Sequence, residues 1–183
     1  MTTNLPYRYI QKTVIACCLV SMVMGCVKDN RERLFELFYP NNLFEIPAGI
    51  GGVFPREVEW SNVATNIDFY LSETGLDTAQ IRDINPIDAT IISLDGFDFD
   101  FAQEISVRIC PTSEQDCIPA DEVFYIDRLD GRAGDAVRLL PTLRNVRRNL
   151  LEQSYKLEIL FFLNGTTQVQ MNAKLDMTFE AYR

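Results

Sequence analysis

The clearest alternation of apolar and polar positions lies near the C-terminus of the chain. Apolar residues take every second position of residues 154–164, and the same two-residue period runs through residues 169–181. This period is typical of strands with one buried and one solvated face. Between the two runs, Asn164 and Gly165 both tolerate the positive φ angles of a type I′ turn. The pattern predicts a C-terminal β-hairpin that forms an outer strand pair of an antiparallel sheet.

Shorter runs of the same kind appear upstream. The predicted strands are residues 43–49, 53–60, 87–95, 104–110, 122–127 and 135–141. Apolar residues at helical spacing predict two short helices, residues 62–74, with Ser61 as N-cap and Gly75 as stop, and residues 142–153. Because strands dominate and do not alternate with helices, we predict a mostly β fold. Its expected form is an antiparallel β-sandwich of immunoglobulin-like type with two short helices.

The first residues of the chain follow a different pattern. Arg8 and Lys12 flank the start of an apolar run at residues 13–24. A helix needs about 20 apolar residues to span a bilayer, so this run is too short. A short apolar run behind positive charges is typical of a signal peptide. The tetrapeptide VMGC at residues 23–26 ends the run.

VMGC resembles the lipobox of bacterial lipoproteins, in which a small residue precedes the cysteine that receives the lipid. The resemblance implies that residues 1–25 are a lipoprotein signal peptide. It also implies that Cys26 carries diacylglycerol on its thiol and a fatty acyl chain, such as palmitate, on its amine. Two or three acyl chains hold a protein durably on a membrane. An ordinary secretory signal with an incidental cysteine, or a signal anchor, is the alternative.

The residues after Cys26 carry sorting information in such lipoproteins. Those of the enteric type stay in the inner membrane when Asp follows the cysteine, and here Val27 follows. The resemblance therefore implies the outer membrane. Lys28 and Asp29 resemble the short Lys-plus-acidic signals that send lipoproteins of Bacteroidota to the cell surface, and a solvated linker is the alternative. Composition does not separate the periplasmic face from the surface face, which is slightly favoured.

Residues 60–183 also resemble, in the order of their elements, the uncharacterised β-sandwich lipoproteins of Bacteroidota. The shared layout is a strand, a Gly-Phe-Asp-Phe turn at residues 96–99, another strand, a late helix and a C-terminal hairpin. Immunoglobulin-like domains of the desiccation-protein type are a more remote likeness. The resemblance implies a fold and transfers no functional residue.

The segment behind the anchor becomes apolar early. We predict a lipidated tether at residues 26–42 and a β-sandwich domain at residues 43–183. Apolar side chains in and just after the tether predict a docking segment for a membrane protein partner, formed by Leu34, Phe35, Leu37, Phe38 and Phe44. The alternative is a helical turn that packs on the core of the domain itself.

A basic cluster is the second candidate docking site. Arg144, Arg147 and Arg148 lie on one side of the predicted second helix of an otherwise acidic chain. Arginine binds phosphate and carboxylate groups bidentately, so the cluster could hold lipopolysaccharide phosphates or an acidic loop of a partner. A solvated helix face paired to nearby acids is the alternative.

Composition excludes several classes of function. The formal charge of −9 becomes −11 without residues 1–25, because that segment holds two cations and no acid. Such a chain is a poor nucleic-acid ligand and is repelled by anionic lipid. The chain has no histidine, which excludes Ser-His-Asp and Cys-His catalysis. A hydrolase with two carboxylates stays open, but no spacing selects a pair. We therefore expect no catalytic residue and no enzymatic activity.

Two cysteines of the exported chain lie far from the anchor, Cys110 and Cys117. We predict a disulfide between them, because disulfides persist in the oxidising compartment that an export signal implies. A metal site would require further ligands, and the chain offers no histidine and no second cysteine pair. Asp95, Asp98 and Asp100 could place oxygens around Ca²⁺, but their spacing is not that of an EF-hand. A capped turn with inward phenylalanines is the alternative, and we expect no metal.

These observations favour a non-enzymatic outer-membrane lipoprotein that serves as an accessory or scaffold subunit of a membrane complex, beside a β-barrel protein. The rival interpretation is a stand-alone surface module for glycan or protein ligands. Such a module requires exposed aromatic side chains, and the candidates are Trp60, Tyr125 and Tyr182. A hydrolase that uses two carboxylates is the third and weakest hypothesis.

Overall fold

The computed structural model describes residues 31–183 with the exception of residue 53 and residues 130–132. Within this part of the chain, Glu32–Arg183 forms one compact unit. The predicted signal peptide, the lipidation site Cys26 and the sorting signal behind it lie outside the described residues. In the part that is described, no helix has the length and apolar character needed to cross a membrane.

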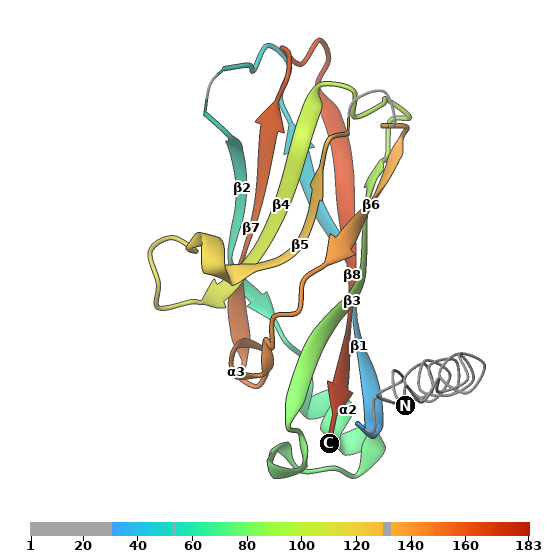
Figure 1. Cartoon of the computed structure of the whole chain (residues 1–183), viewed down its shortest axis with the longest axis vertical. Coiled ribbons are helices and arrows are strands. Elements are labelled where there is room, and N and C mark those ends of the chain that lie inside the picture. Colours follow the sequence, from blue (N-terminus) through green and yellow to red (C-terminus); the bar gives the residue numbers. More distant parts are fainter. Residues whose placement is uncertain (1–30, 53, 130–132) are drawn as a thin grey trace, which may run out of the picture. The chain divides into compact units, whose positions relative to one another are not determined.

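Strands and two short α-helices build this unit (Figure 1). The strands are β1 (Arg33–Ile46), β2 (Arg56–Ala64), β3 (Asp83–Ser93), β4 (Ala102–Pro111), β5 (Glu122–Asp127), β6 (Ala136–Pro141), β7 (Ser154–Leu163) and β8 (Met171–Tyr182). The helices are α2 (Ile67–Thr74) and α3 (Arg147–Leu150), and the single 3₁₀ turns are η1 (Thr78–Gln80) and η2 (Pro119–Asp121). The mostly β class, the antiparallel pairing and the two short helices are confirmed.

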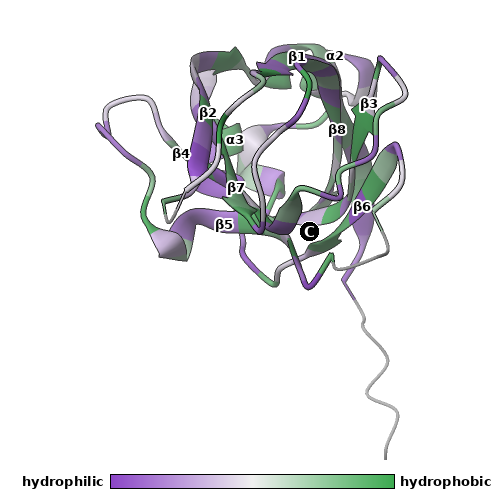
Figure 2. Ribbon diagram, turned by 90° about the horizontal axis from the view of Figure 1, so that it is seen from above, coloured by the Kyte–Doolittle hydropathy of each residue, from purple (hydrophilic) through white to green (hydrophobic). Residues whose placement is uncertain are grey.

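The strands form one antiparallel sheet in the order β1-β8-β3-β6-β5-β4-β7-β2. One half of the sheet consists of β1, β8, β3 and β6, and the other half consists of β5, β4, β7 and β2. A short pairing of Phe124 with Pro141 and of Tyr125 with Leu140 joins β5 to β6 and so connects the halves. Seen from its end, the sheet curls into a nearly closed barrel whose edge strands are β1 and β2 (Figure 2).

The pairing is nested along the chain. β1 pairs with β8, β2 with β7, β3 with β6, and β4 with β5. A long two-stranded ribbon wound in this way is the jelly-roll arrangement. The predicted immunoglobulin-like sandwich is not confirmed. Its first two strands lie side by side in one sheet, whereas β1 and β2 stand at opposite ends of this strand order.

The predicted C-terminal hairpin is wrong. β7 pairs with β2 and β4, whereas β8 pairs with β1 and β3, so the two strands lie in different halves of the barrel. Residues 164–170 cross between the halves. The turn preference of Asn164 and Gly165 is local, but distant strands occupy both edges of β7 and of β8, and this pairing decides where the chain goes.

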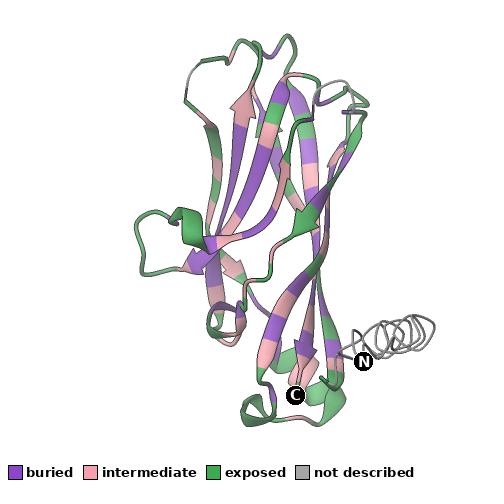
Figure 3. Ribbon diagram, in the orientation of Figure 1, coloured by how far each residue is buried: buried purple, intermediate pink, exposed green. Residues whose placement is uncertain are grey.

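The apolar faces of the strands meet inside the barrel (Figure 3). The alternation predicted for residues 169–181 is confirmed from Met171 onward, whereas Val169 precedes β8 and is 42% exposed. The inward residues of β8 are at most 2% exposed: Met171, Ala173, Leu175, Met177, Phe179 and Ala181. Aromatic rings fill the centre, where Phe179 contacts Tyr39 and Phe124 edge-on. Complete burial of such side chains stabilises the fold by roughly 1.5–3 kcal/mol each.

The predicted tether at residues 26–42 becomes strand β1 from Arg33 onward. Its alternation buries Phe35, Leu37 and Phe44 in the barrel, at 9%, 0% and 8% exposure. The alternative of packing on the domain's own core is therefore correct for these residues, although as a strand and not as a helical turn. Consequently the compact domain begins about ten residues before the predicted boundary at residue 43.

The helices are shorter than predicted. Residues 62–64 extend strand β2, and α2 begins only after Asn66, whose φ of 51° is left-handed. The predicted stop is confirmed, because Gly75 has a φ of 66° and its backbone N–H donates to the Leu71 carbonyl. After Gly75 the chain forms the short turn η1, with a capping box made by Asp77 and Gln80.

Candidate functional site

Three long connections meet at one end of the barrel, where Gly134 of the β5–β6 connection also accepts a hydrogen bond from the Phe99 N–H. The β1–β2, β3–β4 and β7–β8 connections meet at the end opposite to the C-terminus (Figure 1). The backbone N–H of Arg183 donates to the carbonyl of Glu32, so the chain enters and leaves the domain at the other end. We call the end with these three connections the loop end.

Buried Thr167 fastens two of these connections to each other. Its backbone N–H donates to the Ile50 carbonyl over 2.8 Å, and its hydroxyl donates to the Pro47 carbonyl over 2.7 Å. In return, the N–H of Gly49 donates to the Thr167 carbonyl over 2.8 Å. A Cβ atom on Gly51 would lie 2.7 Å from the Thr166 hydroxyl oxygen and 3.2 Å from the Thr166 Cα, so a larger residue there would displace Thr166. The loop end is therefore a pre-formed surface.

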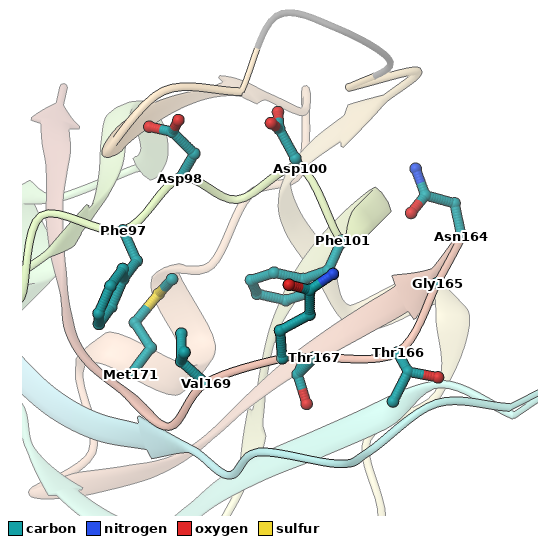
Figure 4. Close-up of a pocket in the computed structure, with 11 residues that line it drawn as sticks. Phe97, Asp98, Asp100, Phe101, Asn164, Gly165, Thr166, Thr167, Val169 and Met171 are labelled. Atoms are coloured by element: carbon teal, nitrogen blue, oxygen red, sulfur yellow. The ribbon is translucent and has the colours of Figure 1, made fainter.

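A cavity of about 600 Å³ lies between the β3–β4 and β7–β8 connections. Its lining residues are Phe97, Asp98, Asp100, Phe101, Asn164, Gly165, Thr166, Thr167, Gln168, Val169 and Met171 (Figure 4). The side chains of Phe97, Val169 and Met171 gather on one side, and the carboxylates of Asp98 and Asp100 point away from them. The cavity thus combines an apolar wall with an acidic rim.

The apolar wall is open to solvent. Two of its residues, Phe97 and Val169, are each 42% exposed, and Met171 is buried behind them at 2%. Small-molecule sites in proteins typically have 300–1,000 Å³ and an apolar lining with a few polar groups. The cavity fits that description, and its acidic rim suits a ligand that carries hydroxyl or cationic groups beside an apolar part.

The three candidate calcium ligands are not brought together. Asp95 accepts hydrogen bonds from the backbone N–H and the side-chain amide of Asn172, over 2.6 and 3.0 Å. Asp98 and Asp100 line the cavity, whereas Asp95 lines a separate shallow pocket of about 510 Å³ with Leu43 and Leu94. Of the described residues, the acidic and cysteine side chains close enough to share an ion do not include these three.

The predicted disulfide between Cys110 and Cys117 is present. It closes the β4–β5 connection into a loop that covers the outer face of β7. The Cys117 N–H donates to Glu158 over 2.8 Å, and the Lys156 ammonium donates to the Gln115 carbonyl. The covalent bond therefore ties the loop to Cys110 on β4, and hydrogen bonds of its backbone groups tie it to β7.

Beneath this loop lies a buried ion pair that the sequence pattern did not reveal. Lys156 and Glu158 are only 3% and 2% exposed, their charged atoms are 3.0 Å apart, and Glu59 lies 3.4 Å from the ammonium. Burial by itself lowers the pKa of Lys156, but hydrogen bonding and attraction to Glu158 outweigh it and raise that pKa. Burial and repulsion from Glu158 raise the pKa of Glu57. Glu57, Glu59 and Glu158 could share a cation, and the Lys156 ammonium already lies beside two of them.

The three arginines of the basic cluster lie in separate environments within the domain. Arg144 pairs with buried Asp121, as the alternative of pairing to nearby acids requires. Arg147 donates to the backbone carbonyls of Ile81 and Thr78 and so holds η1 in place. Arg148 is exposed and lines a cavity of about 450 Å³ beside the disulfide loop. The three arginines therefore do not form one continuous docking surface.

The three aromatic residues considered for ligand binding, Trp60, Tyr125 and Tyr182, do not form one exposed surface. Trp60 is half-buried on β2 and packs edge-on against Phe44, which helps to close the barrel between its edge strands. Tyr125 and Tyr182 are half-buried on β5 and β8, where the Tyr182 hydroxyl donates to Glu180. Among the described residues, the exposed aromatic side chains are instead Phe38, Phe54, Phe69 and Phe97, which no periodicity singles out.

Comparisons with known proteins add little. No protein-family model matches the chain, and no curated protein matches it significantly. Solved structures to which it is similar include a chain from Desmodium yellow mottle tymovirus, with 12% identity, 86% of this chain and 91% of that chain covered, and a TM-score of 0.30. A chain from turnip yellow mosaic virus has 14% identity, 87% and 85% coverage, and a TM-score of 0.30. Likeness at this level carries no argument about this chain.

Proposed function

We propose that the protein is a non-enzymatic lipoprotein of the outer membrane that binds a ligand at the loop end of its barrel. Cys26 would carry the lipid anchor. The observation that supports the proposal most strongly is the cavity of about 600 Å³ at the loop end, with its exposed apolar wall. The chain enters the domain at the opposite end, so an anchored domain would present this cavity away from the membrane.

The chemistry of the cavity supports one class of ligand. Phe97, Val169 and Met171 offer an apolar surface, and Asp98 and Asp100 accept hydrogen bonds or pair with a cation. A glycan with an apolar ring face, or a peptide segment with an apolar and a basic side chain, has the complementary groups. We propose ligands of this kind, and no ordered metal is required for them.

An accessory or scaffold subunit beside a β-barrel is the second proposal. Its main support was the apolar segment from Leu34 to Phe44, and Phe35, Leu37 and Phe44 in that segment are buried in the domain's own core. Phe38 and Leu43 remain 52% and 60% exposed and could contact a partner. We place this role second because most of the apolar side chains in that segment are buried, and only a small exposed surface is left for a partner.

The absence of an enzymatic function remains part of the proposal. The chain has no histidine. The acidic groups Glu57, Glu59 and Glu158 lie close together, but Glu158 is buried under the disulfide loop and is paired with Lys156. A general acid or base must reach its substrate, and Glu158 offers no such access. This arrangement supports a structural role for Glu158.

Glycan and peptide arrays test the binding proposal. We would use the full chain with Cys26→Ala, so that the protein stays soluble, and compare it with Phe97→Ser and Val169→Ser variants. Leu143→Ser is the matched control, because Leu143 is fully exposed on the β6–β7 connection, away from the cavity. We expect array signals that both cavity variants lose and the control keeps. Signals that survive both cavity substitutions, or no signal on either array, would overturn the proposal.

A further inference from the structure

The barrel end where the chain enters carries exposed aromatic side chains around Tyr70. Phe38 on β1 is 52% exposed, and Phe69 on α2 is 61% exposed. The Phe69 and Tyr70 rings contact edge-on at 5.6 Å, and the Phe35 ring stacks on Tyr70 from inside. We call Phe38, Phe69 and Tyr70 the aromatic foot.

The foot is held rigidly at the free edge of β1. The Tyr70 hydroxyl accepts from the Phe38 N–H over 3.0 Å and donates to the Phe38 carbonyl over 3.1 Å. One side chain thus replaces a neighbouring strand at this position and covers the exposed edge. The hydroxyl bonds to the backbone of Phe38, and the Tyr70 ring contacts Phe69, so Tyr70 links the exposed phenylalanines of β1 and α2.

The proposed anchor lies close to this end of the domain. Only residues 27–31 separate Cys26 from Glu32. An extended chain spans at most about 3.3–3.6 Å per residue, so the acylated cysteine reaches no more than about 22 Å from the first residue of the domain. The end with α2 would therefore be held at the membrane surface, whichever face of the membrane is occupied.

We propose that the aromatic foot inserts into the interfacial region of the bilayer and sets the orientation of the domain. Exposed apolar side chains bind the boundary between headgroups and acyl chains, and their contribution adds to that of a covalent lipid. The inference rests on the acylation of Cys26 that the proposed function includes. It is independent of any ligand at the loop end.

The charge around the foot decides which lipids it fits. Helix α2 carries Asp68 and Glu73 and no lysine or arginine. Described cations at this end are paired with acids, Arg33 with Glu36 and Glu180, Arg82 with Asp83, and Arg183 with Glu32. An anionic lipid surface would repel α2, so the foot suits a zwitterionic or neutral interface. Anionic lipid in the test membrane should weaken the insertion.

Quenching by bromine-labelled lipid tests the insertion directly. The acylated full chain is reconstituted into phosphatidylcholine vesicles with brominated acyl chains, after mass spectrometry has confirmed the lipid on Cys26. A Trp60→Phe background removes the one native tryptophan. Phe69→Trp then reports on the foot, and Phe54→Trp, at an 86% exposed position of the loop end, is the matched control.

We expect the Phe69→Trp chain to lose emission on bromination and the Phe54→Trp chain to keep it. Adding phosphatidylglycerol should reduce the loss at position 69. If bromination changes the emission of neither chain, the inference is overturned. The foot would then be a binding surface for a protein. An absence of lipid on Cys26 would overturn it as well. Circular dichroism of each variant checks that the fold is retained, and neither outcome depends on the array result.

Discussion

Two buried tyrosines in the barrel have similar surroundings but different hydrogen bonding. The Tyr39 hydroxyl donates to the Thr65 carbonyl over 2.8 Å. The Tyr155 hydroxyl, at 0% exposure, has no hydrogen-bond partner among the described residues. Burial raises the pKa of both side chains above the ordinary range, so both remain neutral at any physiological pH. A buried polar group without a partner costs free energy, whereas a bonded one does not.

Substituting each tyrosine by phenylalanine separates these cases. Tyr39→Phe should lower the free energy of unfolding by about 1 kcal/mol, because Thr65 loses its donor. Tyr155→Phe should leave the stability unchanged or raise it, because the hydroxyl that is removed forms no bond. Urea unfolding of both variants and the parent measures the difference. An equal loss in both would show that Tyr155 has a partner that these contacts do not include.

Glu57 and Glu59 are neighbours on β2 whose charges act on the fold in opposite directions. Burial and repulsion from Glu158 raise the pKa of Glu57, so ionisation of Glu57 disfavours the folded state as pH rises through that pKa. A hydrogen bond from Ser61, together with Lys156, lowers the pKa of Glu59. The stability that Glu59 contributes is therefore present at neutral pH and is lost as pH falls through its folded pKa.

Glutamine substitutions should consequently shift the melting temperature with opposite signs. At neutral pH, Glu57→Gln should raise it slightly and Glu59→Gln should lower it slightly, since both side chains are exposed and solvent screens their interactions. Both differences should shrink as pH falls below the ordinary value of 4.5, where the carboxylates become protonated. Thermal unfolding from pH 3 to 8 checks this. Shifts of the same sign, or shifts that do not depend on pH, would contradict the account.

At the scale of elements, the outer face of β7 depends on the disulfide loop. Alternation along β7 predicts that Lys156 and Glu158 face water, and they do point away from the barrel interior. They are nevertheless buried, because the loop from Pro111 to Cys117 lies over them. Removing one partner of a buried ion pair leaves an uncompensated charge, whereas replacing both by apolar residues is often nearly neutral.

Lys156→Met should therefore lower the free energy of unfolding by about 3–5 kcal/mol, because Glu158 is left buried without its counter-ion. The double variant Lys156→Met/Glu158→Leu should recover most of that loss. Chemical denaturation of the parent, both single variants and the double variant gives the coupling energy. A double variant no more stable than Lys156→Met would show that the pair itself, and not the uncompensated charge, carries the stability.

Features that depend on local sequence could be predicted, whereas features that depend on contacts between distant residues could not. Strands β2 to β8 could be placed because alternation is a local property of each segment. In β1 only the end is predicted as a strand, and its first ten residues are assigned to the tether. The structure interrupts the alternation between these two parts, because Asn41 has a φ of 60° and the register against β8 shifts there. The strand pairing, the cavity and the covering of β7 depend on residues distant in sequence. Cys117 and Glu158, for example, are 41 positions apart, and no local pattern indicates that contact.

At the scale of the whole domain, two surfaces of different chemistry occupy opposite ends of one barrel. The entry end carries the aromatic foot beside the proposed anchor, and the loop end carries the cavity with its acidic rim. The hydrogen-bonded strands between them fix the separation of the ends. A domain of this design would hold its cavity away from the bilayer, which is the arrangement that a membrane-anchored binding module requires.

The central claim is that ligands bind in the loop-end cavity, and a chemical-shift map tests it most directly. Amide NMR spectra of the Cys26→Ala chain would be titrated with aryl glycosides and arylalkylamines, which pair an apolar ring with hydroxyl or cationic groups. The account predicts shifts confined to residues 97–101 and 164–171 that the Phe97→Ser variant loses. Shifts centred instead on the pocket of Leu43 and Leu94, or no shifts with either class of probe, would contradict it.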